Sequence, residues 1–160
     1  MDKVHLTWRD IEDCVARLIG QLDRDYDCML VVTRGGLVPA CLISERIDLR
    51  NILVAAVMFY TGVDQQLEAP IFLQFPADPL LAGKNILIVD DVWDSGRTIM
   101  AVKERVQDAQ GQPTIAVLHY KPDRSQFPRA KPDLYGKEAS GWLVYPWDPE
   151  NKHTLGLSGG

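Results

Sequence analysis

The sequence predicts an α/β fold in which a doubly wound, mainly parallel sheet is flanked by helices. Strand patterns alternate with helical patterns along the chain, which is typical of parallel sheets. Four apolar segments are typical of strands buried on both faces: residues 28–33, 52–60, 86–89 and 114–120. Polar turns follow three of these strands, and in such a sheet the carboxyl ends of the strands share one edge. The sequence therefore predicts one ligand site at that edge.

The length and composition fit a single globular domain. The chain has 160 residues, of which 46% are hydrophobic and 24% are charged. Its net charge of −5 disfavours nonspecific binding to nucleic acid. No apolar run approaches the ~18 residues of a membrane span, and we see no secretory leader. Cys14, Cys28 and Cys41 lie in apolar contexts without metal-ligand spacing, so we expect buried free thiols and a cytoplasmic location.

The first element is predicted to be a helix that begins after Thr7. Thr7 is followed three residues later by Asp10, which resembles a capping box. Apolar residues then recur at helical spacing and form one face, namely Ile11, Val15, Leu18, Ile19 and Leu22. We assign packing to this helix and no chemistry.

The strand at residues 28–33 leads into a turn that contains Arg34, Gly35 and Gly36. Glycine lets the backbone approach a ligand closely, and arginine can bind a pair of phosphate oxygens. Pro39 then lies near the start of a helix that carries apolar residues up to Ile47. The alternative is an ordinary strand-to-helix turn with an arginine on the surface.

Residues 61–80, after the strand at 52–60, have few regular signals. Gly62 and three prolines interrupt this segment, although residues 71–75 are compatible with a short extended piece. A loop of this length in a compact domain is usually functional or mobile. No lysine or arginine occurs in residues 61–83, whereas three acidic residues do, Asp64, Glu68 and Asp78.

The most informative stretch is NILIVDDVWDSGRT, residues 85–98. Its apolar strand ends at the paired carboxylates Asp90 and Asp91, and a small-residue loop leads into a helix over residues 98–109. The amides of that loop and of the first helical turn can bind a phosphate, and the carboxylates can accept from sugar hydroxyls or bind a metal. A sugar phosphate suits this layout. The alternatives are a generic strand that ends in Asp, or a response-regulator receiver, whose acid pair follows the first strand.

Lys121 follows the strand at residues 114–120, on the ligand side of the predicted sheet. A solvated lysine is the alternative. From residue 123 onward, prolines exclude a long helix, and aromatic residues concentrate. This segment either fills the core or forms a lid that stacks on an aromatic ligand. We divide the single domain into a core (1–122), a C-terminal hood (123–150) and a frayed tail (151–160).

The whole set resembles the type I phosphoribosyltransferase family, and is most similar to its small purine enzymes of xanthine-guanine and hypoxanthine type. The resemblance covers about residues 7–148 and is carried by RGGLVPA at 34–40, ILIVDDVWDSGRT at 86–98, Lys121-Pro122, and W-x-x-x-P-W-D at 142–148. It implies the type I phosphoribosyltransferase fold. It also implies Mg²⁺-dependent transfer of ribose 5-phosphate from phosphoribosyl diphosphate (PRPP) to guanine, xanthine or hypoxanthine, with release of pyrophosphate.

The resemblance also implies site residues. The residues expected to bind PRPP are Arg34, Gly35, Gly36, Asp90, Asp91, Asp94, Ser95, Gly96, Arg97 and Thr98. Asp94 also matches the carboxylate that handles the proton on purine N7. In the base site, Lys121 would reach the 6-oxo group, Trp142 would stack on the ring, and Leu143 would read its edge through backbone atoms. Mg²⁺ would lie close to Asp91 and Asp148. We further expect a homodimer or homotetramer that binds no nucleic acid.

Two features depart from the family's pattern. The family's mobile loop usually starts Ser-Tyr and carries Lys or Arg that close over pyrophosphate, but here Phe59-Tyr60 takes that place and residues 61–83 lack any cation. Val144 stands where an acid would be expected in a xanthine enzyme. The alternative hypothesis is therefore a regulatory protein of the same fold that binds PRPP or a nucleotide. An adenine or pyrimidine enzyme is a third possibility.

Overall fold

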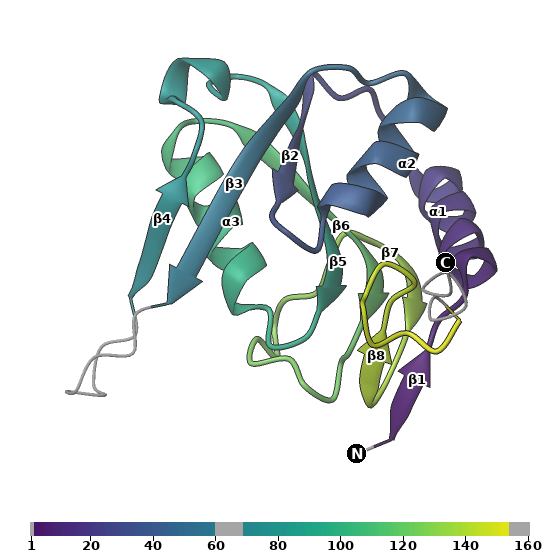
Figure 1. Ribbon diagram of the computed structural model, residues 1–160. Coiled ribbons are helices and arrows are strands. Elements are labelled where there is room, and N and C mark those ends of the chain that lie inside the picture. Colours follow the sequence, from purple (N-terminus) through teal and green to yellow (C-terminus); the bar gives the residue numbers. More distant parts are fainter. Residues whose placement is uncertain (1, 60–68, 154–160) are drawn as a thin grey trace.

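The computed structural model describes residues 2–59 and 69–153 (Figure 1). Within these residues the central sheet has six strands in the order β4-β3-β2-β5-β6-β7, all parallel except β4, which runs antiparallel to β3. The strands are β2 (Cys28–Val32), β3 (Ile52–Phe59), β4 (Pro70–Gln74), β5 (Asn85–Trp93), β6 (Gln112–Tyr120) and β7 (Leu134–Glu138). The predicted doubly wound, mainly parallel sheet is confirmed.

Helices cover both faces of this sheet. Helices α1 (Trp8–Gln21) and α2 (Leu37–Ile47) lie on one face, and α3 (Arg97–Asp108) lies on the other (Figure 1). Strand side chains alternate between the two cores: Met29 and Val31 of β2 pack on the α1 and α2 side, and the other three residues of β2 pack on the α3 side. Burial on both faces explains why the strands read as continuous apolar runs.

Helix α1 begins with the capping box that the sequence predicted. The Asp10 backbone N–H donates to Thr7 Oγ1 at 3.2 Å, and the Thr7 backbone N–H donates to Asp10 Oδ2 at 2.7 Å. The apolar face of the helix is buried through Ile11, Val15 and Leu18. The helix therefore serves packing, as expected.

A second, small sheet joins the two ends of the chain, which the sequence did not predict. Strand β1 (Lys3–His5) pairs in parallel with β8 (Trp142–Val144), so N-terminal residues belong to the hood. Residues 134–138, which we placed in the hood, instead form β7 at the edge of the central sheet, so that boundary was wrong. Asn151 is fully buried, and its Nδ2 donates to three carbonyl groups at distances of 2.9, 2.8 and 3.0 Å. We expected fraying from residue 151, but ordered packing includes Asn151. Residues 154–160 lie outside the described residues.

Strand β5 is longer than its apolar run. We expected it to end at Val89, with Asp90 and Asp91 in a turn, but its ladder with β6 continues to the pair Trp93↔Tyr120. Backbone pairing with β6 extends the strand through both acids, even though their side chains are polar. The acid pair is therefore held by the sheet itself.

Other expectations have mixed outcomes. Residues 71–75 were expected to be extended, and β4 confirms this; a 3₁₀ turn at Asp78–Leu80 follows. Cys14 and Cys28 are buried and free, but Cys41 lies on the exposed side of α2, so its expected burial was wrong. Residues 60–68, which include the first part of the cation-free segment, lie outside the described residues. Of the helices that are described, none has the length and apolar character needed to cross a membrane.

Candidate active site

Two adjoining hollows lie where β5 ends. The larger, about 620 Å³, is lined by the turn after β2, the end of β5, the end of β6 and the hood. The smaller, about 270 Å³, is lined by β2, β3, β5 and the loop that leads into α3. Asp91, Val92 and Asp94 line both hollows. The two spaces therefore meet at these residues.

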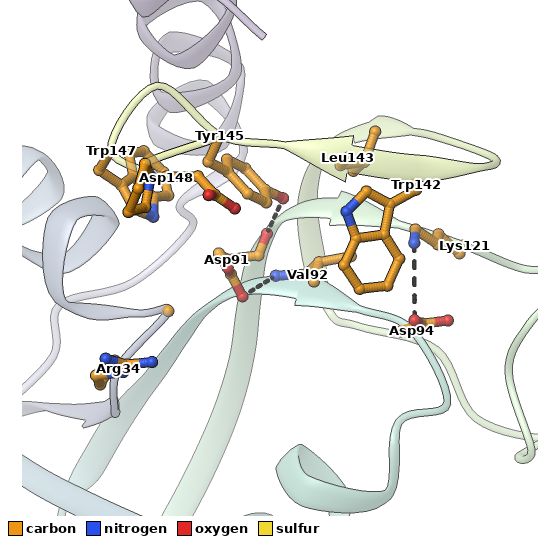
Figure 2. A pocket seen from close by; sticks show the side chains of 12 residues that line it. Arg34, Asp91, Val92, Asp94, Lys121, Trp142, Leu143, Tyr145, Trp147 and Asp148 are labelled. Carbon is orange, nitrogen blue, oxygen red and sulfur yellow. Dashed lines mark hydrogen bonds and ion pairs between the residues drawn. The ribbon is translucent and has the colours of Figure 1, made fainter. Parts of the chain in front are cut away.

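The larger hollow contains an exposed ring and a buried cation. Figure 2 shows Trp142 and Leu143 of β8 on one side and Asp91 and Asp94 on the other. The Trp142 residue is 51% exposed, so a face of its ring is open to a planar ligand, whereas Lys121 is only 5% exposed. All the residues that we expected to bind the base line this hollow.

The Asp94 carboxylate lies between two cations. Lys121 Nζ is 3.7 Å from Asp94 Oδ2, and Arg124 Nε donates to Asp94 Oδ1 at 3.1 Å. The backbone N–H of Lys121 donates to the carbonyl of Trp93 at 3.0 Å, which fixes the end of β6 beside the end of β5. Residues thirty positions apart in the sequence are thereby brought to one polar cluster.

The smaller hollow lies at the start of α3 and is lined by Asp94, Ser95, Gly96, Arg97 and Thr98, together with Asp90 and Asp91. Gly96 has a φ of +83°, and a Cβ placed there would lie 2.4 Å from Trp93 Nε1. Only glycine fits this turn without strain. The first amides of α3 have no acceptor within the helix, which makes this a favourable place for a phosphate.

The two acids of β5 are arranged so that their charges are unfavourable in the free protein. The Asp91 backbone N–H donates to Asp90 Oδ1 at 2.9 Å, and the Val92 N–H donates to Asp91 Oδ1 at 2.7 Å. Burial raises the pKa of Asp90 well above its usual value, and the adjacent Asp91 carboxylate raises it further. Burial also raises the pKa of Asp91. A ligand that brings hydroxyl donors or a cation would favour the ionised pair.

The turn after β2 brings Arg34 and Gly35 to the larger hollow, and it begins with a cis peptide bond between Thr33 and Arg34. A Cβ on Gly35 would lie 2.5 Å from the Asp91 carboxylate, so the turn can approach this acid only through glycine. A Cβ on Gly36 would lie 2.4 Å from the Val89 carbonyl oxygen. Gly36 lines neither hollow; it allows α2 to start close against β5.

The donor set fits a magnesium ion shared with a substrate. Asp91 and Asp148 both line the larger hollow. The described residues contain no group of three or more His, Cys, Asp or Glu side chains placed to hold a metal. Mg²⁺ is commonly bound by one or two carboxylates, with water and substrate phosphates completing its shell. Two carboxylates that line one hollow, one of them also lining the hollow at the start of α3, agree with that mode.

Sequence reasoning missed four residues of the larger hollow: Val92, Tyr145, Trp147 and Pro149. The rings of Tyr145 and Trp147 are stacked, with centroids 4.6 Å apart and planes inclined by 15°. The Tyr145 hydroxyl donates to the Asp91 carbonyl oxygen at 3.2 Å (Figure 2). The density of aromatic residues in the hood was a signal for them, but it does not tell which rings face the ligand.

Comparison with known proteins gives consistent matches. Residues 6–152 match the phosphoribosyl transferase domain family. The chain is 31% identical over 161 residues to a xanthine-guanine phosphoribosyltransferase of Desulfotalea psychrophila, covering 99% of this chain and 89% of that protein. A purine phosphoribosyltransferase from Pyrococcus horikoshii superposes with a TM-score of 0.80 at 35% identity, covering 92% of this chain and 95% of the other. A hypothetical protein from Neisseria gonorrhoeae, solved with bound ppGpp, gives a TM-score of 0.79 at 26% identity, covering 98% and 94%.

Proposed function

Because the chain belongs to the phosphoribosyl transferase domain family, we propose that it transfers ribose 5-phosphate from PRPP to a 6-oxopurine base. The meeting of the two hollows at Asp91 and Asp94 carries this proposal. One hollow offers a ring and an ammonium group for a base, and the other offers an amide-rich loop for a phosphate. The ribose carbon at which the substitution occurs must lie between base and phosphate, which is where the two hollows join.

In the base site, Trp142 stacks on the purine and the Lys121 ammonium donates to its 6-oxo oxygen. Backbone atoms of Leu143 read the edge of the ring. Asp94 handles the proton on purine N7, and its two neighbouring cations hold the carboxylate in place. A nitrogen of the base attacks the anomeric carbon while the bond to the pyrophosphate oxygen breaks.

In the PRPP site, the ribose hydroxyls donate to Asp90 and Asp91, and the 5-phosphate binds the loop from Asp94 to Thr98. Arg34 binds the pyrophosphate, and Gly35 lets the turn come close. Asp91 and Asp148 would hold Mg²⁺ together with pyrophosphate oxygens, and the ion would neutralise charge on the leaving group. The protein itself contributes orientation and electrostatic stabilisation.

The direct test is to incubate the protein with PRPP, Mg²⁺ and guanine, xanthine, hypoxanthine or adenine in turn, and to measure nucleotide and pyrophosphate. The matched control is the double variant Asp90→Asn and Asp91→Asn, assayed for PRPP binding by calorimetry. It should lose PRPP binding, because both carboxylates that would accept from the ribose hydroxyls are removed. It should stay folded, because the two charges it removes are partly buried and are not needed for packing. Absence of product from every base would contradict the transfer, and normal PRPP affinity in the double variant would contradict the ribose site.

A second candidate is a regulatory protein that binds PRPP or a nucleotide with little turnover. The lack of lysine and arginine in residues 61–83 favours it, since a closing loop without cations stabilises leaving pyrophosphate poorly. The similar N. gonorrhoeae structure holds ppGpp, a guanine nucleotide. Calorimetric binding of ppGpp or PRPP by a protein that forms no product with any base would favour this candidate.

We also propose a cytoplasmic homodimer or homotetramer, built from one transferase domain per chain. Three free cysteines, two of them buried, agree with a reducing compartment. Light scattering coupled to gel filtration would measure the oligomeric state.

A further inference from the structure

Four residues that are far apart in the sequence form one buried hydrogen-bond network beside the larger hollow. Cys14 Sγ lies 3.7 Å from His119 Nε2, and His119 Nδ1 lies 2.9 Å from the Tyr145 hydroxyl. That hydroxyl donates to the backbone carbonyl of Asp91 at 3.2 Å. Cys14 and His119 are each 2% exposed, and Tyr145 is 6% exposed. Buried polar groups of this kind are stable only when each finds a partner.

The donors and acceptors of the network have one consistent order. Tyr145 has a single hydroxyl proton, which it donates to Asp91, so its oxygen must accept from His119 Nδ1–H. His119 Nε2 then carries no proton and accepts from the Cys14 thiol. This order requires a neutral imidazole, and burial together with the positive charge of Lys137 lowers the pKa of His119 to about 4. Burial also raises the pKa of both Cys14 and Tyr145, which keeps their protons in place.

We infer that His119 and Tyr145 are positioning residues that hold Asp91 where the ribose hydroxyls of PRPP bind, an inference that rests on the proposed function. Four contacts fix Asp91: Tyr145 donates to its carbonyl oxygen, its own N–H donates to Asp90 Oδ1, the Val92 N–H donates to its Oδ1, and the backbone of Gly35 lies against its carboxylate. Displacing such a group by about 1 Å can lower a rate by 10²-fold. The network therefore acts through Asp91 and does not touch the reacting atoms.

The same network joins the two halves of the site. Tyr145 directly follows β8, which carries Trp142 and Leu143 of the base hollow, whereas Asp91 belongs to the central sheet. His119 lies on β6 in register with Val92 of β5, so it reaches the acid strand from its neighbour. The Tyr145 hydroxyl thereby links the strand of the ribose acids to the hood.

The decisive variant is Tyr145→Phe, which keeps the ring stacked on Trp147 and removes only the hydroxyl. We expect kcat/KM for PRPP to fall about 10- to 100-fold, the usual effect of losing a group that orients a ligand-binding residue. The KM for the purine should change much less. His119→Leu should give a similar loss, and adding it to Tyr145→Phe should cause little further loss, because both break one network. His119→Asn should restore much of the activity, since its amide N–H can replace Nδ1–H.

The matched control is Tyr26→Phe. Tyr26 has a buried hydroxyl with no hydrogen-bond partner among the described residues, so the same atom is removed outside the network. This variant should keep wild-type kinetics. Each variant is also titrated with PRPP and Mg²⁺ by calorimetry, at a temperature where circular dichroism shows it to be folded. Tyr145→Phe should bind PRPP about 10-fold more weakly, by the same orienting effect.

The outcomes separate the two proposals. If the wild type transfers ribose phosphate but Tyr145→Phe matches it in kcat/KM and in PRPP affinity, the positioning role is overturned and the proposed function stands. Additive losses in the double variant, or failure of His119→Asn to restore activity, would also overturn it. If the wild type binds PRPP without turnover, the PRPP affinities of the variants measured by calorimetry test the network. If the wild type neither binds PRPP nor forms product, both proposals are overturned.

Discussion

Asp94 lies where both hollows meet, and each of its carboxylate oxygens is close to a cation. A residue that only bound phosphate would gain nothing from carrying a negative charge there. An anion between the base hollow and the phosphate hollow is instead suited to a proton or a developing positive charge. The placement of this one side chain therefore favours transfer over simple binding.

We predict that Asp94→Asn leaves PRPP binding largely intact but lowers kcat by about 10²-fold or more, the usual scale for a general acid–base group. The amide oxygen can still accept from Arg124, so the local structure should persist. Steady-state kinetics and calorimetry measure the two effects, with the exposed Asp123→Asn as the control. Unchanged turnover would remove Asp94 from the mechanism.

We expect Lys121 to select which purines bind, because its buried ammonium can only donate hydrogen bonds. We predict that 6-oxopurines are used over adenine by at least ~10²-fold, since the adenine 6-amino group would face the ammonium donor with no acceptor between them. Lys121→Met should erode this preference mainly by loss of 6-oxopurine activity. Trp142→Ala should instead weaken all purines alike, because stacking ignores the exocyclic groups.

Competition between hypoxanthine and adenine, followed by product analysis, measures the preference. If adenine is the best substrate, or if Lys121→Met leaves the ranking unchanged, Lys121 does not read the 6-position.

At the scale of elements, β5 shows how backbone pairing and side-chain pattern can differ. Hydropathy predicts a strand of four residues, but β6 supplies hydrogen-bond partners as far as Trp93, so the strand includes both acids. The backbone that carries the two acids is thereby held by pairing with β6 rather than left in a free turn. The end of β5 is consequently part of the sheet, and the loop that leads into α3 begins only at Asp94.

The buried Asn151 side chain bonds to backbone carbonyl groups of both the N-terminal segment and the hood. We predict that Asn151→Ala lowers the free energy of unfolding by about 2 kcal/mol, because three buried carbonyl groups lose their shared donor. The KM for the purine should rise as well, since β8 carries Trp142 and Leu143. Urea unfolding and steady-state kinetics measure both effects.

The control for this variant is Glu150→Gln, which breaks the exposed ion pair with Lys3 and should change the free energy of unfolding much less than Asn151→Ala does. If Asn151→Ala is no more harmful than Glu150→Gln, Asn151 does not hold the hood.

At the scale of the whole molecule, buried titratable groups change the stability of the fold in opposite directions when the pH is lowered. The pKa of His119 is lowered to about 4, so below pH 6.5 the unfolded chain binds a proton that the folded chain excludes, and stability falls until about pH 4. The pKa values of Asp90 and Asp91 are raised, so the folded chain binds protons before the unfolded chain does. Acidification through those raised pKa values therefore adds stability.

The His119 contribution can be separated by difference. We predict that the stability of the wild type relative to His119→Asn falls by up to about 3 kcal/mol between pH 6.5 and 4, and then levels off. Urea unfolding of both proteins across this range gives the difference curve. A flat curve would mean that His119 titrates normally and is not held neutral by burial.

Much of this protein could be predicted from local sequence. Apolar runs and helical spacing predicted the four inner strands of the sheet and the helices that cover it, because burial on both faces leaves a pattern in each segment, whereas the edge strand β7 was not predicted. The capping box at Thr7 was predictable because it involves only four consecutive residues. The residues expected to bind ligand are in large part those that line the two hollows, since each lies next to a strand end or in a dense motif.

Only the tertiary structure decided the rest, because the deciding contacts join distant residues. The pairing of β1 with β8 and the three bonds of Asn151 depend on where the two chain ends meet. The network from Cys14 to Asp91 spans helix, sheet and hood, and no spacing in the sequence indicates it. Hydropathy indicates which residues are buried. Which buried polar groups form hydrogen bonds with one another depends on the tertiary structure.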